Sequence, residues 1–76
     1  MTKVVFGATV TIYDQQKDVT VTYQIVGEDE AMSDSKKISF NSPLGRALIG
    51  RVSGDEFIVK APKGELTYEV QNISYN

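Results

Sequence analysis

Residues 41–50 have the sequence NSPLGRALIG, and this stretch sets the fold class of the chain. Ser42 can accept a hydrogen bond from a free N–H of a first helical turn, and Pro43 suits the first helical position because its missing N–H is not needed there. Gly50 can adopt the left-handed conformation that ends a helix. Between them lies an apolar stripe at helical spacing, made of Leu44, Ala47 and Leu48. We therefore predict one short helix of about two turns.

Gly45 weakens this helix by roughly 1 kcal/mol relative to Ala, because glycine loses more backbone freedom in a helix. A helix so short is marginal in isolation. We therefore expect it to be held by packing onto a sheet.

The segments on both sides of the helix alternate between apolar and polar residues, as half-buried strands do. The first predicted strand has an apolar face made of Val4, Phe6, Ala8, Val10 and Ile12. A polar hairpin loop at 14–18 leads to a second strand at 19–25, and a short third strand follows at 38–40. After the helix come strands at 57–60 and 66–75, joined by a turn at 61–64. The last strand changes phase near Gln71 and Asn72, which predicts a β-bulge.

The sequence thus predicts an α+β fold of about five antiparallel strands with one short helix. Its 76 residues are enough for one domain, and a formal net charge of −2 gives no basic field for nucleic acid. The chain has no Cys and no His, which excludes disulfides, the usual zinc sites, and thiol or imidazole catalysis. No apolar run approaches the ~20 residues of a membrane span and no secretory signal is visible, so we expect a cytoplasmic location.

Four stretches together resemble the C-terminal domain of the bacterial transcript-cleavage factors of the GreA/GreB family, with GreA the more similar. They are VFGATVT at 5–11, YQIVGEDEA at 23–31, SPLGRALIGR at 42–51 and YEVQNISY at 68–75. The resemblance covers essentially all 76 residues in order, so residues 1–76 are expected to be a single domain of this type. Family members usually carry Ala where this chain has Gly45 and Lys where it has Arg51.

The resemblance implies an FKBP-like fold, a curved antiparallel sheet on one short helix. It also implies docking on bacterial RNA polymerase, against a coiled coil of the largest subunit at the secondary channel. In the family, a separate N-terminal helical hairpin enters that channel, its acidic tip helps to hold a catalytic magnesium, and the polymerase cuts backtracked RNA. That hairpin is not among these residues, so we expect a monomeric, non-enzymatic binding module without cofactor, metal or membrane partner. Nucleic acid would be met only within the polymerase complex.

The resemblance also implies which residues face the polymerase. They are those at the start of the helix: Asn41, Ser42, Pro43, Leu44 and Arg46. Two alternatives stay open, namely a stand-alone polymerase-binding regulator with the same domain, such as an anti-cleavage homologue, and an FKBP-like prolyl isomerase. An isomerase needs a deep aromatic pocket, and fold alone does not carry function.

One cluster of carboxylates invites a metal interpretation: Glu28, Asp29, Glu30 and Asp34. The spacing lacks the alternating oxygen ligands and distal Glu of a calcium loop. We therefore predict a solvated charged loop across residues 27–37, with at most a contact to a basic partner surface at its rim.

Overall fold

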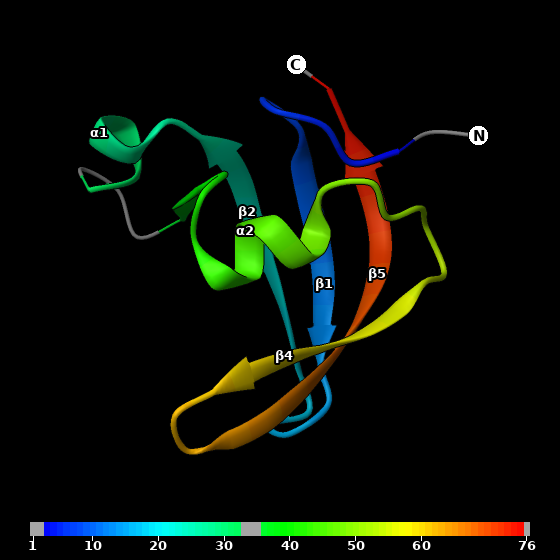
Figure 1. The fold of residues 1–76 in the computed structure, drawn as a ribbon. Coiled ribbons are helices and arrows are strands. Elements are labelled where there is room, and N and C mark those ends of the chain that lie inside the picture. Colours follow the sequence, from blue (N-terminus) through cyan, green and yellow to red (C-terminus); the bar gives the residue numbers. More distant parts are fainter. Residues whose placement is uncertain (1–2, 33–35, 76) are drawn as a thin grey trace.

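The computed structural model describes residues 3–32 and 36–75. Within them a curled five-stranded sheet has the order β3-β2-β1-β5-β4. The strands are β1 (Thr9–Asp14), β2 (Val19–Val26), β3 (Lys37–Ser39), β4 (Glu56–Ala61) and β5 (Gly64–Ser74), and the helices are α1 (Glu28–Ala31) and α2 (Pro43–Leu48). Figure 1 shows α2 lying in front of β1 and β2, with the β4–β5 hairpin sweeping forward below it. The predicted α+β architecture is therefore confirmed, with two differences in detail.

The first difference concerns β3, which pairs with β2 in parallel, so that the sheet is mixed. Antiparallel neighbours can be joined by a tight hairpin, whereas parallel neighbours need a crossover. Here residues 27–36 supply the crossover, and they include α1, where the sequence predicted only a loop. Asp34, which the sequence placed in that loop, lies outside the described residues.

The second difference concerns the first predicted strand, which starts later than its alternation suggested. Gly7 has φ +90°, and the amide of Ala8 donates to Val5 O at 3.0 Å, so a tight turn interrupts the pattern. Val4 stays buried, but Phe6 is 60% exposed instead of lying on the core face. The alternation in residues 4–12 therefore spans two backbone segments rather than one strand.

The predicted bulge in the last strand is confirmed. Thr11 is paired with Asn72 and Ile12 with Val70, so Gln71 is the extra residue on β5. Such a bulge increases the local twist of its strand. The long β5 can therefore follow β1 at one end and pair with β4 at the other (Figure 1).

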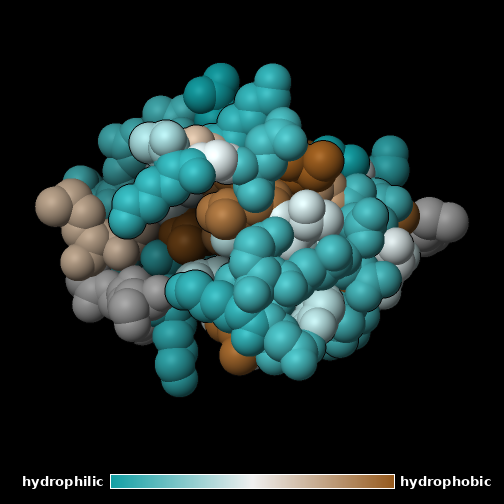
Figure 2. Space-filling view, turned by 90° about the horizontal axis from the view of Figure 1, so that it is seen from below, coloured by the Kyte–Doolittle hydropathy of each residue, from teal (hydrophilic) through white to brown (hydrophobic). Residues whose placement is uncertain are grey.

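The core lies between the concave side of the sheet and α2. Its fully buried side chains include Val10 and Ile12 of β1, Ile25 of β2, Val70 of β5 and Leu48 of α2. Seen from below, apolar surface gathers in the middle of the face within a rim of hydrophilic side chains (Figure 2). The short α2 thus covers only part of the concave face. None of the described helices has the length and apolar character needed to cross a membrane.

Candidate functional site

The five residues predicted to face a partner lie together at the turn from β3 into α2. Asn41, Pro43 and Arg46 are exposed, whereas Ser42 and Leu44 are half-buried. Leu44 packs against the hydrophobic core. The prediction therefore divides into three accessible side chains and two that hold the segment in place.

A compact hydrogen-bond network fixes this turn. The carbonyl of Ser39 accepts from the Ser42 amide at 3.0 Å and from the Ser42 hydroxyl at 2.7 Å. The Ser42 hydroxyl in turn accepts from the Gly45 amide at 3.0 Å, so the predicted N-cap is confirmed. The amide of Asn41 donates to the Ser39 hydroxyl at 3.0 Å. Backbone and side chains thus hold residues 39–45 in one conformation.

Gly45 has a role here that helix propensity does not reveal. It is buried, and a Cβ built on it would lie 2.1 Å from the Ser39 carbonyl oxygen. Glycine at this position therefore permits the close approach of β3 to α2. This packing role adds to the helix-weakening effect that the sequence predicted for Gly45.

The sequence prediction missed the contribution of α1 to this site. The side-chain amide of Asn41 donates to Glu28 Oε1 at 3.1 Å, which links the turn to α1. A depression of about 480 Å³ lies between α1, β3 and the turn, and Met32, 87% exposed, is on its rim. Helical periodicity cannot reveal a helix of four residues; the only available signal was the three acidic residues of its first turn, which favour the positive end of a helix.

Two exposed aromatic rings lie close to the same turn. Phe40 directly precedes Asn41, and its ring meets that of Phe6 edge-to-face, with centroids 5.7 Å apart. Both side chains are substantially exposed, at 43% for Phe40 and 60% for Phe6. A second pair, Phe57 and Tyr68, stacks in and beside the core, again with centroids 5.7 Å apart. These four rings are thus divided between the surface and the core.

The turn carries few charges. Arg46 is the one cation among the five predicted residues, and the acid Glu28 of α1 accepts a hydrogen bond from the side chain of Asn41. Among residues 3–32 and 36–75 no three acidic side chains are grouped so as to hold a metal ion. The two groups with a raised pKa, Tyr13 and Tyr68, lie in β1 and β5.

Known proteins share both this sequence and this fold. Residues 1–75 match the family model described as transcription elongation factor, GreA/GreB, C-term. A transcription elongation factor GreA from Halorhodospira halophila is 58% identical over 73 residues, covering 96% of this chain and 46% of that protein. GreA of Pseudomonas aeruginosa is 51% identical with the same coverage. The chain thus spans just under half the length of these relatives.

Solved structures agree with the sequence relatives. The GreA factor homolog 1 (Gfh1) protein of Thermus thermophilus superposes with a TM-score of 0.77 at 32% identity, covering 95% of this chain and 48% of that one. The prokaryotic transcription elongation factor GreA/GreB from Nitrosomonas europaea gives a TM-score of 0.76 at 26% identity, covering 95% and 60%. Sequence and fold together show that this chain belongs to the family of the C-terminal domain of the transcription elongation factors GreA and GreB.

Proposed function

We propose that this chain is the RNA polymerase-docking domain of a GreA-like elongation factor, and that it docks through the turn between β3 and α2. The observation that carries this proposal is the contrast within that turn. Ser39, Ser42 and Gly45 fix it from below, while the side chains of Asn41, Pro43 and Arg46 are exposed. Surface loops held rigid by a scaffold are where binding residues concentrate.

The proposed contact has a mixed chemical character. Asn41 and Arg46 offer hydrogen-bond donors, and Pro43 and Phe40 offer apolar surface beside them. Aromatic rings and arginine are enriched at the centres of protein interfaces. A coiled coil of the largest polymerase subunit, presenting carboxylates beside apolar positions, would match this surface.

In this proposal the domain itself is not catalytic. RNA cleavage belongs to the polymerase, assisted by an N-terminal hairpin of the complete factor. The purified 76-residue chain should therefore not accelerate cleavage by a stalled elongation complex, and it should compete with the full-length factor for docking. Cleavage above the intrinsic rate of the polymerase would contradict this division of labour.

The docking surface is tested by binding of folded variants to core RNA polymerase. Asn41→Lys, Pro43→Ala and Arg46→Glu should each weaken binding, while Lys60→Glu on β4 serves as the control for a charge change elsewhere. Circular dichroism verifies that each variant is folded. If the three variants bind like the parent while Lys60→Glu does not, docking uses another face.

A second candidate function is considered because the solved structures with a similar fold include Gfh1 proteins. A polymerase-binding regulator without cleavage activity would use the same docking domain. The curated GreA relatives are more similar in sequence, at 58% against 32% identity, which favours the GreA-like reading. A cleavage assay on the complete protein separates the two, since only the GreA-like factor stimulates cleavage.

A further inference from the structure

The outer edge of β2 is open along its first half. β1 covers the inner side of β2, but β3 pairs with its outer side only between Gln24 and Val26, so among the described residues no strand lies on the outer side of the stretch from Val19 to Tyr23. β2 carries no charged residue and no proline along its whole length. At the opposite edge of the sheet, β4 carries Glu56 and Lys60. Charges and prolines are the usual protection of an edge strand against further pairing, and the open half of β2 lacks both.

The backbone groups at this edge have the arrangement that another strand requires. The amide of Gln24 donates outward to Lys36 O at 3.0 Å, whereas the amide of Ile25 donates toward the chain leading into β1. Successive residues of a strand direct their backbone groups to opposite sides. Thr20 and Thr22 therefore direct their N–H and C=O outward, as Gln24 does. Two donors and two acceptors stand in line with the bonds that β3 already makes.

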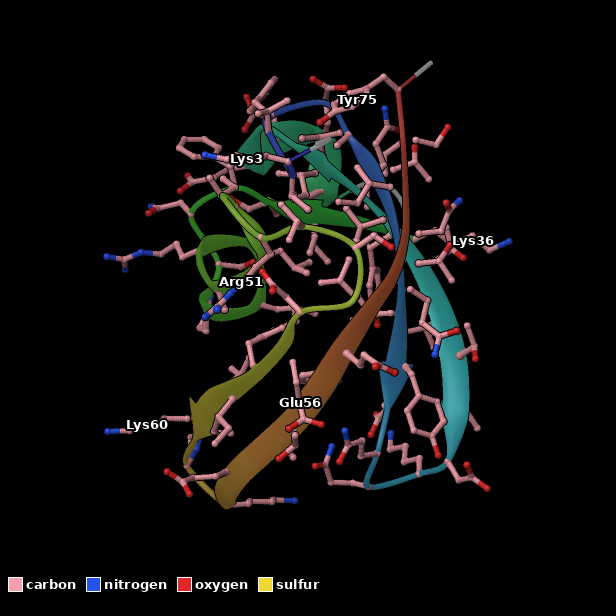
Figure 3. The ribbon with its side chains drawn as sticks, turned by 90° about the vertical axis from the view of Figure 1, so that its right-hand side faces the viewer. Lys3, Lys36, Arg51, Glu56, Lys60 and Tyr75 are labelled. Carbon is pink, nitrogen blue, oxygen red and sulfur yellow. The ribbon has the colours of Figure 1, made fainter. Side chains whose placement is uncertain are left out.

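A groove accompanies this edge, and its charge is basic. It has a volume of about 630 Å³ and is lined by Thr9, Thr20, Val21, Thr22, Tyr23, Gln24, Lys36 and Lys37. The lining thus contains two lysines and no carboxylate. Figure 3 shows Lys36 projecting beside β2, on the side of the molecule away from Lys60 and Arg51.

We propose that the open edge of β2 binds an extended acidic segment of a partner protein as an added strand in line with β3. Main-chain hydrogen bonds to Thr20 and Thr22 would supply affinity, as in other cases of strand addition. Carboxylates beside Lys36 and Lys37 would supply the preference for an acidic sequence. This edge is separate from the turn at the start of α2, so the inference does not depend on polymerase docking.

Two other occupants fit the observations less well. A second copy of this chain would bring its own β2 to the edge, and β2 has no carboxylate to meet the lysines. A DNA backbone offers phosphate acceptors for the two amides but no donor for the carbonyls of Thr20 and Thr22, and an RNA backbone adds only its 2′-hydroxyls as donors. An acidic strand offers acceptors and donors to the open edge and carboxylates to its basic lining.

The test uses the 76-residue chain and a fluorescein-labelled eight-residue peptide of alternating valine and glutamate. We expect saturable binding by fluorescence anisotropy that weakens as salt is added, with amide NMR shifts centred on Thr20 and Thr22. The same peptide with lysine in place of glutamate should bind at least tenfold more weakly. A valine/glutamate peptide whose edge-facing amides are N-methylated should also lose binding, which separates strand pairing from charge attraction alone.

Variants of the chain complete the test. The double variant Lys36→Glu, Lys37→Glu should weaken binding of the acidic peptide by about tenfold or more, because the loss of attraction and the gain of repulsion add. Lys60→Glu on the opposite edge should leave binding unchanged. Thr22→Pro removes one outward amide without removing a bond to β1 and should abolish binding; if it does not fold, the N-methylated peptide answers the same question. No binding, equal binding of the acidic and basic peptides, shifts centred on β4, or a dimer in sedimentation that buries this edge would each overturn the proposal.

Discussion

Replacing Gly45 by Ala separates two explanations of α2, because helix propensity and packing predict opposite signs. Propensity alone predicts that Gly45→Ala stabilises the protein by about 1 kcal/mol. In the structure, the new Cβ would lie 2.1 Å from the Ser39 carbonyl oxygen, and contacts below 3.0 Å essentially never occur. The carbonyl would have to retreat, and it holds two hydrogen bonds from Ser42.

The magnitude follows from these terms. Overpacking a filled site costs about 1–3 kcal/mol, and a weakened hydrogen bond adds about 0.5–1.5 kcal/mol. After subtracting the propensity gain of about 1 kcal/mol, we expect a net loss of about 0.5–3.5 kcal/mol. For a domain of this size that corresponds to a fall in Tm of about 2–28 °C.

Thermal unfolding followed by circular dichroism measures this change, with urea unfolding as a second measure. Gly27→Ala is the matched control, because Gly27 has an ordinary φ of −70° and nothing lies within 4 Å of its added Cβ. The control should change stability by no more than about 0.5 kcal/mol. If Gly45→Ala instead raises the stability by about 1 kcal/mol, the Ser39 carbonyl does not lie as close to α2 as the structure places it.

Four further predictions test other parts of the fold. Ser42→Ala should cost about 1 kcal/mol in urea unfolding because the Gly45 amide loses its acceptor, whereas Pro43→Ala should change little. Asp14→Ala should cost about 1–3 kcal/mol because Asp14 Oδ1 accepts from the amides of Gln16 and Lys17 in the β1–β2 turn; Asp14→Asn, which keeps one acceptor, should lose less. Burial and the nearby Asp14 raise the pKa of Tyr68 above its ordinary 10.0, so the unfolded chain loses this proton first and stability falls as pH rises above about 10; Tyr68→Phe should reduce that fall in pH-dependent unfolding. A protease-coupled assay on a proline peptide should show only the uncatalysed isomerisation rate, because the ring pairs Phe6–Phe40 and Phe57–Tyr68 do not line one pocket.

The strands and α2 could be predicted from sequence because each has a local signal. The alternation in β2, the Ser42-Pro43 start of α2, and the phase change at Gln71 are all features of neighbouring residues. The direction of β3 is different. A strand of three residues has the same sequence pattern whether it pairs in parallel or antiparallel fashion, and the choice depends on how the chain connects β2 to β3. The sequence pattern also continued through Gly7, where a positive φ turns Phe6 to the surface.

The candidate site could be located from the family resemblance, but its division of roles could not. The sequence predicted that Ser42 caps the helix, but the resemblance also placed both Ser42 and Asn41 on the partner-facing surface, and it did not say which of them is accessible. In the structure the Ser42 hydroxyl makes two bonds within the turn, whereas Asn41 is exposed and reaches Glu28. Changes at Ser42 should therefore reduce stability and docking together.

The same geometry makes docking and stability separable at the outward-facing positions. Pro43 and Arg46 contribute exposed side chains, and the bonds that fix the turn run through Ser39, Ser42 and Gly45 beneath them. A change at Pro43 or Arg46 leaves those bonds in place, so any loss of polymerase binding there reports on the contact itself. Gly45→Ala does the reverse, because it displaces the support while leaving every exposed side chain present. If Gly45→Ala lowers Tm yet the folded fraction at low temperature binds polymerase as the parent does, the turn adapts on docking and its rigidity is not what positions Asn41 and Arg46.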